Sequence, residues 1–139
     1  VVGMKDSSGD IDNMIGAAKN FPGFAVFAGS DELMLPLIEA GGAGCITACA
    51  NVGAKLAGEL YQGWLGGDDV QAIHETLTAV RHTIAKYPLS TALKTLMARH
   101  SGNDDWLNIR APLMRMSDAD RNALYEAFDA IGFQVPLAA

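Results

Sequence analysis

The sequence predicts an α/β domain built on parallel strands, followed by a region made of helices. In the first sixty or so residues, short apolar runs alternate with helical segments at a spacing of roughly twenty residues, which is typical of βα units on a parallel sheet. In the remainder of the chain, apolar residues recur only at helical spacing. We therefore predict three βα units in residues 1–65 and a C-terminal helical region in residues 66–139.

The expected strands bring three polar segments together. The strands are the apolar runs Val1–Met4, Phe24–Ala28 and Cys45–Ala48. Because crossovers between parallel strands are right-handed, the C-terminal ends of the strands lie at one edge of the sheet. Lys5, the turn Gly29–Glu32 and Thr47 all follow or end a strand, so we expect them to converge on one mouth.

The expected helices are marked by their apolar faces and by their caps. Asn51 is expected to cap a helix over Gly53–Trp64, Pro88–His100 forms a shorter helix, and Ser117 opens the last helix with acids in its first turn. The apolar faces are Ile11, Met14, Ile15 and Ala18; Leu33, Leu35, Leu37 and Ile38; Val70, Ile73, Leu77, Val80 and Ile84; and Leu124, Phe128 and Ile131.

Composition excludes several classes of function. The chain of 139 residues has a formal net charge of -6, which argues against binding to nucleic acid or to an anionic membrane. No apolar run approaches the length of a membrane span, and no signal peptide is recognised. Only two cysteines are present, so reduced thiols and a cytoplasmic location are expected.

Three strands are too few to close a barrel. A (β/α)8 barrel typically needs about 250 residues, so the sequence is compatible either with a small open sheet or with a barrel from which five strands are missing. Because the chain opens directly in an apolar run without an initiating Met, we interpret it as a fragment.

Lys5 is the first candidate catalytic residue. It lies where an apolar strand meets a polar turn, and an apolar mouth would favour the neutral amine over the ammonium ion. A neutral amine attacks a ketone carbonyl and forms a Schiff base. The alternative is an ordinary lysine at a strand end that extends to water.

The other two strand ends offer groups that could bind a substrate. Gly29 permits close approach of the backbone to a ligand, and Asp31 and Glu32 could accept hydrogen bonds from substrate hydroxyls. Two acids at this place would repel a phosphate. The alternative is that Ser30 or Asp31 caps the next helix. The hydroxyl of Thr47 could donate to a substrate oxygen, or Thr47 could be an ordinary β-branched strand residue.

The remaining candidates are better explained by structure. Gly41–Gly44 precedes a strand instead of following one, so tight helix-to-strand packing is expected and not a phosphate loop. Cys45 and Cys49 lack the spacing of a redox or metal motif and are expected to be buried free thiols. The three histidines, which also lack metal spacing, are expected at the surface; they are His74, His82 and His100.

Three motifs in order resemble the dihydrodipicolinate synthase / N-acetylneuraminate lyase superfamily. Gly3–Asp10 (GMKDSSGD) looks like its Schiff-base lysine motif. Gly41–Val52 (GGAGCITACANV) resembles its last barrel strand and the turn that follows. Ile109–Leu113 (IRAPL), before a final helix, is similar to its helical tail. The resemblance covers essentially the whole chain.

The resemblance implies a fold and a set of site residues. The chain would hold strands six to eight of a TIM barrel and its C-terminal helical extension, in a homodimer or homotetramer without metal or organic cofactor. Pyruvate, or the pyruvyl part of a longer 2-oxo acid, would be held as an imine on Lys5, and Ile46 would offer its backbone carbonyl nearby. The acids Asp31 and Glu32 would bind sugar-like hydroxyls, and the hydroxyl groups of Ser7 and Thr47 would line the pocket.

The family's catalytic tyrosine and its paired-threonine carboxylate site are absent from this chain. The three tyrosines present fall in or near helices of the C-terminal region; they are Tyr61, Tyr87 and Tyr125. We therefore expect the fragment alone to be inactive unless an N-terminal half of the same barrel supplies strands one to five.

The leading hypothesis is a Schiff-base lyase, aldolase or dehydratase that acts on a hydroxylated 2-oxo acid. One alternative is dihydrodipicolinate synthase proper, which condenses pyruvate with aspartate semialdehyde. The others are a non-catalytic barrel relative and a self-sufficient three-strand module.

Overall fold

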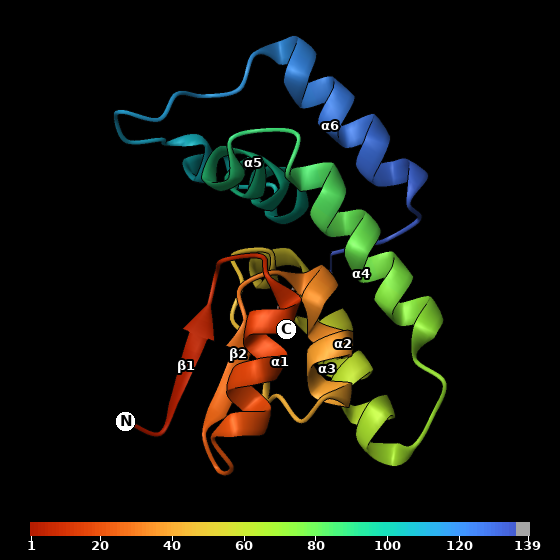
Figure 1. Ribbon diagram of the computed structural model, residues 1–139. Coiled ribbons are helices and arrows are strands. Elements are labelled where there is room, and N and C mark those ends of the chain that lie inside the picture. Colours follow the sequence, from red (N-terminus) through yellow and green to blue (C-terminus); the bar gives the residue numbers. More distant parts are fainter. Residues whose placement is uncertain (136–139) are drawn as a thin grey trace. The chain divides into compact units, whose positions relative to one another are not determined.

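The computed structural model describes residues 1–135 and shows a three-stranded parallel sheet at the start of the chain (Figure 1). The strands are β1 (Gly3–Asp6), β2 (Ala25–Ala28) and β3 (Gly44–Cys45), in the order β1-β2-β3. Lys5 lies opposite Phe27, and Ala28 lies opposite Cys45. The predicted parallel α/β arrangement is therefore confirmed.

The third strand is shorter than predicted. It ends at Cys45, so Ile46, Thr47 and Ala48 lie beyond it. The cause is its neighbour: β2 stops at Ala28, and the chain then turns into the short 3-10 helix η1 (Asp31–Leu33). The last backbone hydrogen bond of this ladder runs from the Ile46 amide to the Ala28 carbonyl, at 2.9 Å, and Thr47 has passed the end of β2.

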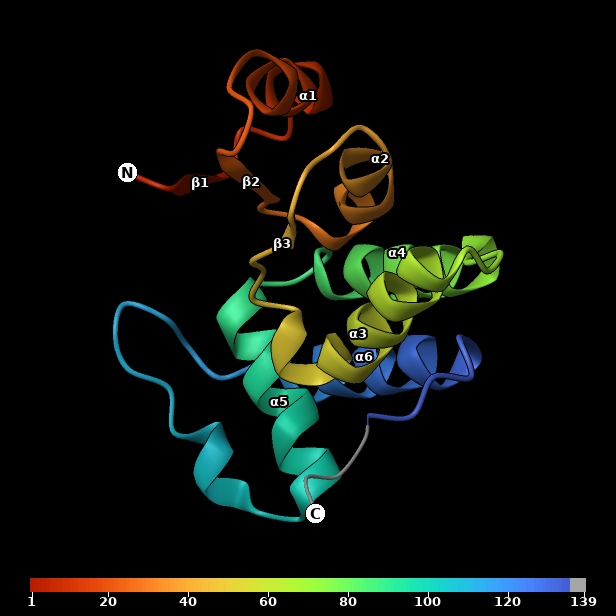
Figure 2. The same ribbon diagram turned by 90° about the horizontal axis from the view of Figure 1, so that it is seen from below.

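Two helices cover one face of the sheet. Figure 2 shows α1 (Ile11–Asn20) and α2 (Met34–Glu39) on the same side of the strands. Their apolar residues meet those of β2 in one buried cluster, formed by Met14, Val26, Ala28 and Leu37. The predicted apolar face of α1 is confirmed, since Ile11, Ile15 and Ala18 pack against this cluster.

The remaining helices follow the predicted order, with one error in capping. They are α3 (Ala50–Gly66), α4 (Gln71–Ile84), α5 (Leu89–Ser101), the 3-10 helix η2 (Asp104–Leu107) and α6 (Asp118–Ala130). Ser117 caps α6 as predicted, because its hydroxyl accepts from the Asp120 amide. The prediction for Asn51 was wrong: α3 begins at Ala50, three residues before the predicted Gly53, so Asn51 lies inside the helix. Its side chain donates to the Ala48 carbonyl at 2.8 Å.

The chain divides into two compact units. The first consists of Val1–Thr47 with Leu56–Thr78, and the second of Ala48–Lys55 with the chain from Ala79 onward. The division therefore falls within α3 and α4, whereas the sequence placed a boundary after residue 65. The assignment of residues 1–65 to barrel units stays a prediction.

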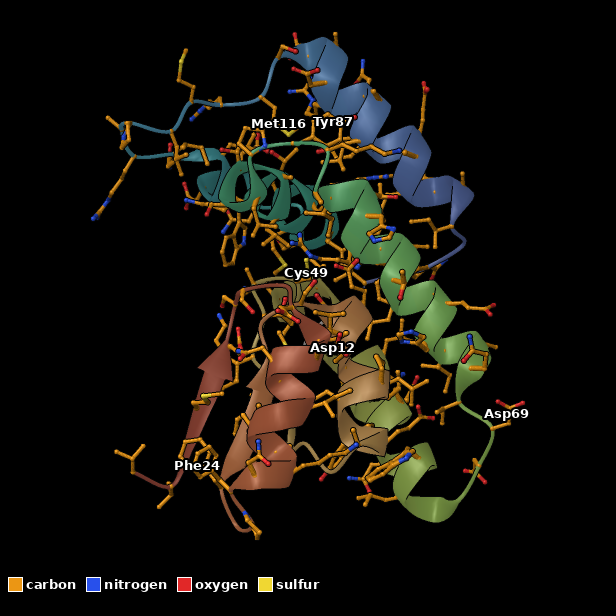
Figure 3. All side chains as sticks on the ribbon, in the orientation of Figure 1. Asp12, Phe24, Cys49, Asp69, Tyr87 and Met116 are labelled. Carbon is orange, nitrogen blue, oxygen red and sulfur yellow. The ribbon has the colours of Figure 1, made fainter. Side chains whose placement is uncertain are left out.

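Each unit has its own core. In the first unit a second cluster joins α2 with the later part of α3 and the start of α4, through Met34, Leu35, Ile38, Ala57, Leu60, Val70 and Leu77. In the second unit Val80, Ile84, Leu96, Leu124 and Phe128 are among the buried residues. Tyr87 and Met116, which lie side by side in Figure 3, pack against this second core. Among the described residues no helix is both long enough and apolar enough to cross a membrane.

Candidate active site

The C-terminal ends of the three strands meet at one edge of the sheet, as the sequence predicted. The parallel register brings the end of β1 beside the end of β2, and the Gly29 amide donates to the Asp6 carbonyl at 2.7 Å. The Ile46 amide makes the equivalent bond to the end of β2. Lys5, Gly29 and Ile46 are thus held on neighbouring strand ends by backbone hydrogen bonds.

Lys5 projects from the face of the sheet that α1 and α2 leave uncovered. Side chains alternate between the two faces of a strand. The neighbours of Lys5 in β1 point to the helix side, since Met4 packs in the cluster under α1 and Asp6 is bonded to Asn13 of α1. Lys5 is exposed in this chain and shares its face with Phe27, directly opposite on β2.

The same alternation places an apolar side chain from the third strand end on this face. Cys45 packs with the clusters on the helix side, so Ile46, the next residue, points the other way. Ile46 is 50% exposed. The uncovered face therefore presents a primary amine among apolar groups, which is an arrangement suited to a lysine that works as a neutral nucleophile.

A hydrogen-bonded turn fixes the chain immediately after Lys5. The Asp6 carboxylate accepts from the Ser8 amide and from the Asn13 side chain, both at 2.7 Å. Hydrogen bonds from the Ser8 side chain and from its backbone amide hold the pKa of Asp6 below the ordinary value of 3.8, against a smaller opposing effect of burial, and Asn13 adds to the lowering. Sequence reasoning missed Asp6, although an aspartate two residues before a serine is a recognisable turn signal.

Gly29 allows the first two strand ends to touch. A Cβ at this position would lie 2.6 Å from the Ser7 Oγ and 2.7 Å from the Asp6 carbonyl oxygen. Real Cβ atoms do not approach so closely, so any larger residue would push β1 and β2 apart at the position next to Lys5. The sequence predicted that Gly29 allows the backbone to approach a ligand closely. In the structure the close approach is between Gly29 and the chain at Asp6 and Ser7.

The two acids after β2 occupy different environments. Asp31 is fully buried, and its Oδ2 accepts a hydrogen bond from the Thr47 hydroxyl at 2.8 Å. Glu32 is only partly buried, and its Oε1 accepts from the Ser30 hydroxyl at 3.2 Å. Ser30 precedes η1 but makes no capping hydrogen bond with its side chain. Thr47 and Asp31 thus link the chain after β3 to the chain after β2.

Both cysteines are free, as predicted. Cys49 is buried, and Cys45 is partly buried with its Sγ 3.4 Å from the Met34 Sδ. Burial, together with the negative charge of Asp31, raises the pKa of the Cys45 thiol to about 11. A thiol that stays protonated is a poor nucleophile, so Cys45 contributes packing and not chemistry.

The remaining candidates have structural roles. A Cβ at Gly42 would clash with Leu37, which confirms tight packing at this glycine, whereas Gly41 and Gly44 have positive φ angles of +96° and +135°. His82 is exposed as predicted, but His74 and His100 are partly buried, since they lie on faces of α4 and α5 that pack inward. Among residues 1–135 no three His, Cys, Asp or Glu side chains gather as metal ligands.

Comparison with known proteins gives one consistent result. The profile of the dihydrodipicolinate synthetase family matches residues 1–131. An uncharacterised DapA-like lyase of Chloroflexus aurantiacus is 33% identical over 129 residues, which are 93% of this chain and 43% of that protein. The 4-hydroxy-tetrahydrodipicolinate synthase of Sphingopyxis alaskensis is 30% identical and matches 95% of this chain and 46% of its own length.

Solved structures agree. The dihydrodipicolinate synthase of Bacillus anthracis superposes with a TM-score of 0.84 at 26% identity, over 94% of this chain and 45% of that chain. The enzyme of Aquifex aeolicus gives a TM-score of 0.82 at 27% identity, over 100% of this chain and 47% of that chain. The chain thus spans a little under half the length of these relatives. With its parallel α/β sheet and a profile match over nearly its whole length, the chain belongs to the dihydrodipicolinate synthetase family.

Proposed function

We propose that this chain forms part of a lyase that binds pyruvate, or a hydroxylated 2-oxo acid, as a Schiff base on Lys5. In this proposal β1, β2 and β3 are strands six, seven and eight of a (β/α)8 barrel. The observation that carries it is the position of Lys5. The lysine is the last residue but one of a parallel strand, on the face opposite the covering helices, next to Phe27 and beside the Asp6 turn.

The chemistry follows from the amine. In a closed barrel the face that bears Lys5 would be shielded from water, and apolar neighbours favour the neutral amine. The nitrogen attacks the ketone carbon of the 2-oxo acid, and loss of water then gives a protonated imine. This imine accepts the electron pair released when the C3–C4 bond breaks and becomes an enamine, while the C4 hydroxyl loses its proton and becomes an aldehyde. Protonation of the enamine at C3 restores the imine, and its hydrolysis releases pyruvate and regenerates the amine. The same steps in reverse form a carbon–carbon bond.

The other strand ends would line the substrate site. Gly29 follows β2, the neighbour of β1, and Ile46 follows β3, on the other side of β2. Glu32 is the partly buried acid of the turn after β2. We propose that Glu32 binds substrate hydroxyls and that Ser7 and Thr47 contribute hydroxyl groups.

The complete protein must supply what these residues cannot. A proton-relay group, a site for the substrate carboxylate and strands one to five would come from an N-terminal half of the same barrel. We therefore propose that this chain alone is inactive, and that the complete enzyme is a cytoplasmic homodimer or homotetramer.

A second candidate is the synthase reaction, in which the imine of pyruvate condenses with aspartate semialdehyde. Relatives named 4-hydroxy-tetrahydrodipicolinate synthase match 95% of the chain at 28% and 30% identity. The two candidates share the imine on Lys5 and differ in the second substrate. Assays of the complete protein with aspartate semialdehyde and, separately, with hydroxylated 2-oxo acids distinguish them.

The shared step is tested by reductive trapping. The complete protein is incubated with pyruvate and borohydride, digested, and its peptides are analysed by mass spectrometry. We expect one carboxyethyl group on Lys5, none on the exposed Lys19 or Lys55, and no adduct in a Lys5→Arg variant. If the peptide that contains Lys5 gains no mass after treatment with pyruvate and borohydride, the proposal is refuted.

A further inference from the structure

We propose that Asp31 is a positioning residue that acts through Thr47 and does not itself contact the substrate. This inference rests on the proposed function, because it assigns roles within the same site. From the sequence alone, both acids are candidates for binding a substrate. In the structure Asp31 is fully buried, whereas Glu32 is only partly buried.

The burial of Asp31 excludes direct contact with a substrate. Its exposed fraction is 0% in a chain whose sheet still has one uncovered face. Strands or partners added to that face can only reduce accessible surface further. A substrate hydroxyl would therefore have to displace protein atoms to reach this carboxylate, whereas Glu32 retains accessible surface at the same turn.

The hydrogen bond from Thr47 gives the buried carboxylate a function. Thr47 lies two residues beyond the end of β3, past the last backbone bond of the sheet, which the Ile46 amide makes. The 2.8 Å bond to Asp31 therefore ties the segment after β3 to the segment after β2 where the ladder no longer does so. A hydrogen bond to a charged acceptor is strong and directional, so it restricts the position of Thr47.

Holding Thr47 also orients the Ile46 carbonyl, which the proposed function places in the lining of the substrate site. The carbonyl of Ile46 belongs to the planar peptide unit that joins Ile46 to Thr47. A rotation of Thr47 would therefore change the direction of that carbonyl. Asp31 thus acts on the reacting centre through one side chain and one peptide plane, without touching the substrate.

Four variants of the complete protein test the inference. Asp31→Asn weakens the bond, Thr47→Val removes the donor, Thr47→Ser keeps it, and Glu39→Gln, an exposed acid at the end of α2, is the matched control. We expect Asp31→Asn and Thr47→Val each to slow trapping of pyruvate on Lys5 by about tenfold, as for loss of a hydrogen bond to a charged group. Combining the two should add little. Thr47→Ser should trap faster than Thr47→Val because it keeps the donor, and Glu39→Gln should trap at the normal rate.

Pyruvate is used as the probe because it has no hydroxyl group that Asp31 or Glu32 could bind. If Asp31 instead contacted substrate hydroxyls, Asp31→Asn would leave the trapping of pyruvate unchanged and raise KM for a hydroxylated 2-oxo acid. That result would overturn the inference. Glu32→Gln is expected to raise KM for the hydroxylated substrate.

Hydrogen exchange provides a readout that does not depend on activity. In Asp31→Asn the peptide that contains Ile46 and Thr47 should exchange faster, while the peptide that contains α1 should not change. Unchanged exchange at Thr47 would refute positioning by Asp31. Failure of wild-type protein to trap pyruvate would refute the proposed function instead, and the exchange experiment would still decide the role of Asp31.

Discussion

Replacing Gly29 with alanine is expected to separate the ends of β1 and β2. The new Cβ would lie 2.6 Å from the Ser7 Oγ, 2.7 Å from the Asp6 carbonyl oxygen and 2.9 Å from the Ser7 Cα. A serine side chain can rotate, but the other two atoms belong to the backbone. The clash is therefore relieved only by movement of one strand end away from the other.

The cost of this movement has two parts. Overpacking a close contact destabilises a protein by about 1–3 kcal/mol. The movement also lengthens the 2.7 Å bond from the Gly29 amide to the Asp6 carbonyl, and losing such a bond costs about 0.5–1.5 kcal/mol. We expect Gly29→Ala to lower the free energy of unfolding by roughly 2–4 kcal/mol, measured by urea denaturation of the complete protein.

Gly16→Ala is the matched control. A Cβ at Gly16, inside α1, would have no neighbour within 4 Å, and alanine is favoured over glycine in a helix by about 0.5–1 kcal/mol. The control should therefore be as stable as the wild type or more stable. A Gly29→Ala protein with wild-type stability and an unchanged trapping rate at Lys5 would show that the strand ends do not need this close approach.

Three further predictions concern other parts of the first unit. Asp10→Ala removes the N-cap of α1, whose carboxylate accepts from two backbone amides, and should lower the free energy of unfolding by about 1 kcal/mol in urea denaturation. The lowered pKa of Asp6 stabilises the folded state fully above the ordinary value of 3.8, and this stabilisation is lost as the pH falls below 3.8 through the folded pKa. The stability difference between wild type and Asp6→Asn should therefore shrink as the pH is lowered over that range; a constant difference would contradict the role of the Asp6 hydrogen bonds. Cys45, with a pKa of about 11 against an ordinary 9.0, should be alkylated about a hundredfold more slowly than a free thiol at mildly alkaline pH, and mass spectrometry of the cysteine peptides would detect any faster modification.

Much of the fold could be predicted from local patterns. The helical face of α1, the stripe of α4 and the cap at Ser117 are set by residues a few positions apart, and such spacings are visible in a sequence. The direction of the strands was also predictable, because a helix between two strands returns the chain to the same end of the sheet. The comparisons confirmed the family that the motifs around Lys5 suggested.

The errors occurred where the outcome depended on a distant partner. The length of β3 is set by where β2 ends. The helix α3 begins three residues before its predicted start, so Asn51 lies inside it and donates instead of capping. The histidines were placed at the surface by default, but the packing of α4 and α5 turns two of them partly inward.

The sequence by itself determined that Lys5 lies near the C-terminal end of an apolar strand, that two further strand ends join it at one edge, and that the chain resembles the dihydrodipicolinate synthetase family. Only the tertiary structure decided that Asp31 is buried against Thr47 while the adjacent Glu32 keeps accessible surface, and that Gly29 is needed for contact with Ser7. The physical reason is that both decisions depend on side chains from another strand end: Thr47 is sixteen residues from Asp31. Neighbouring residues of similar chemistry look alike in a sequence, and the direction in which the backbone turns each of them is fixed only when the strands pack.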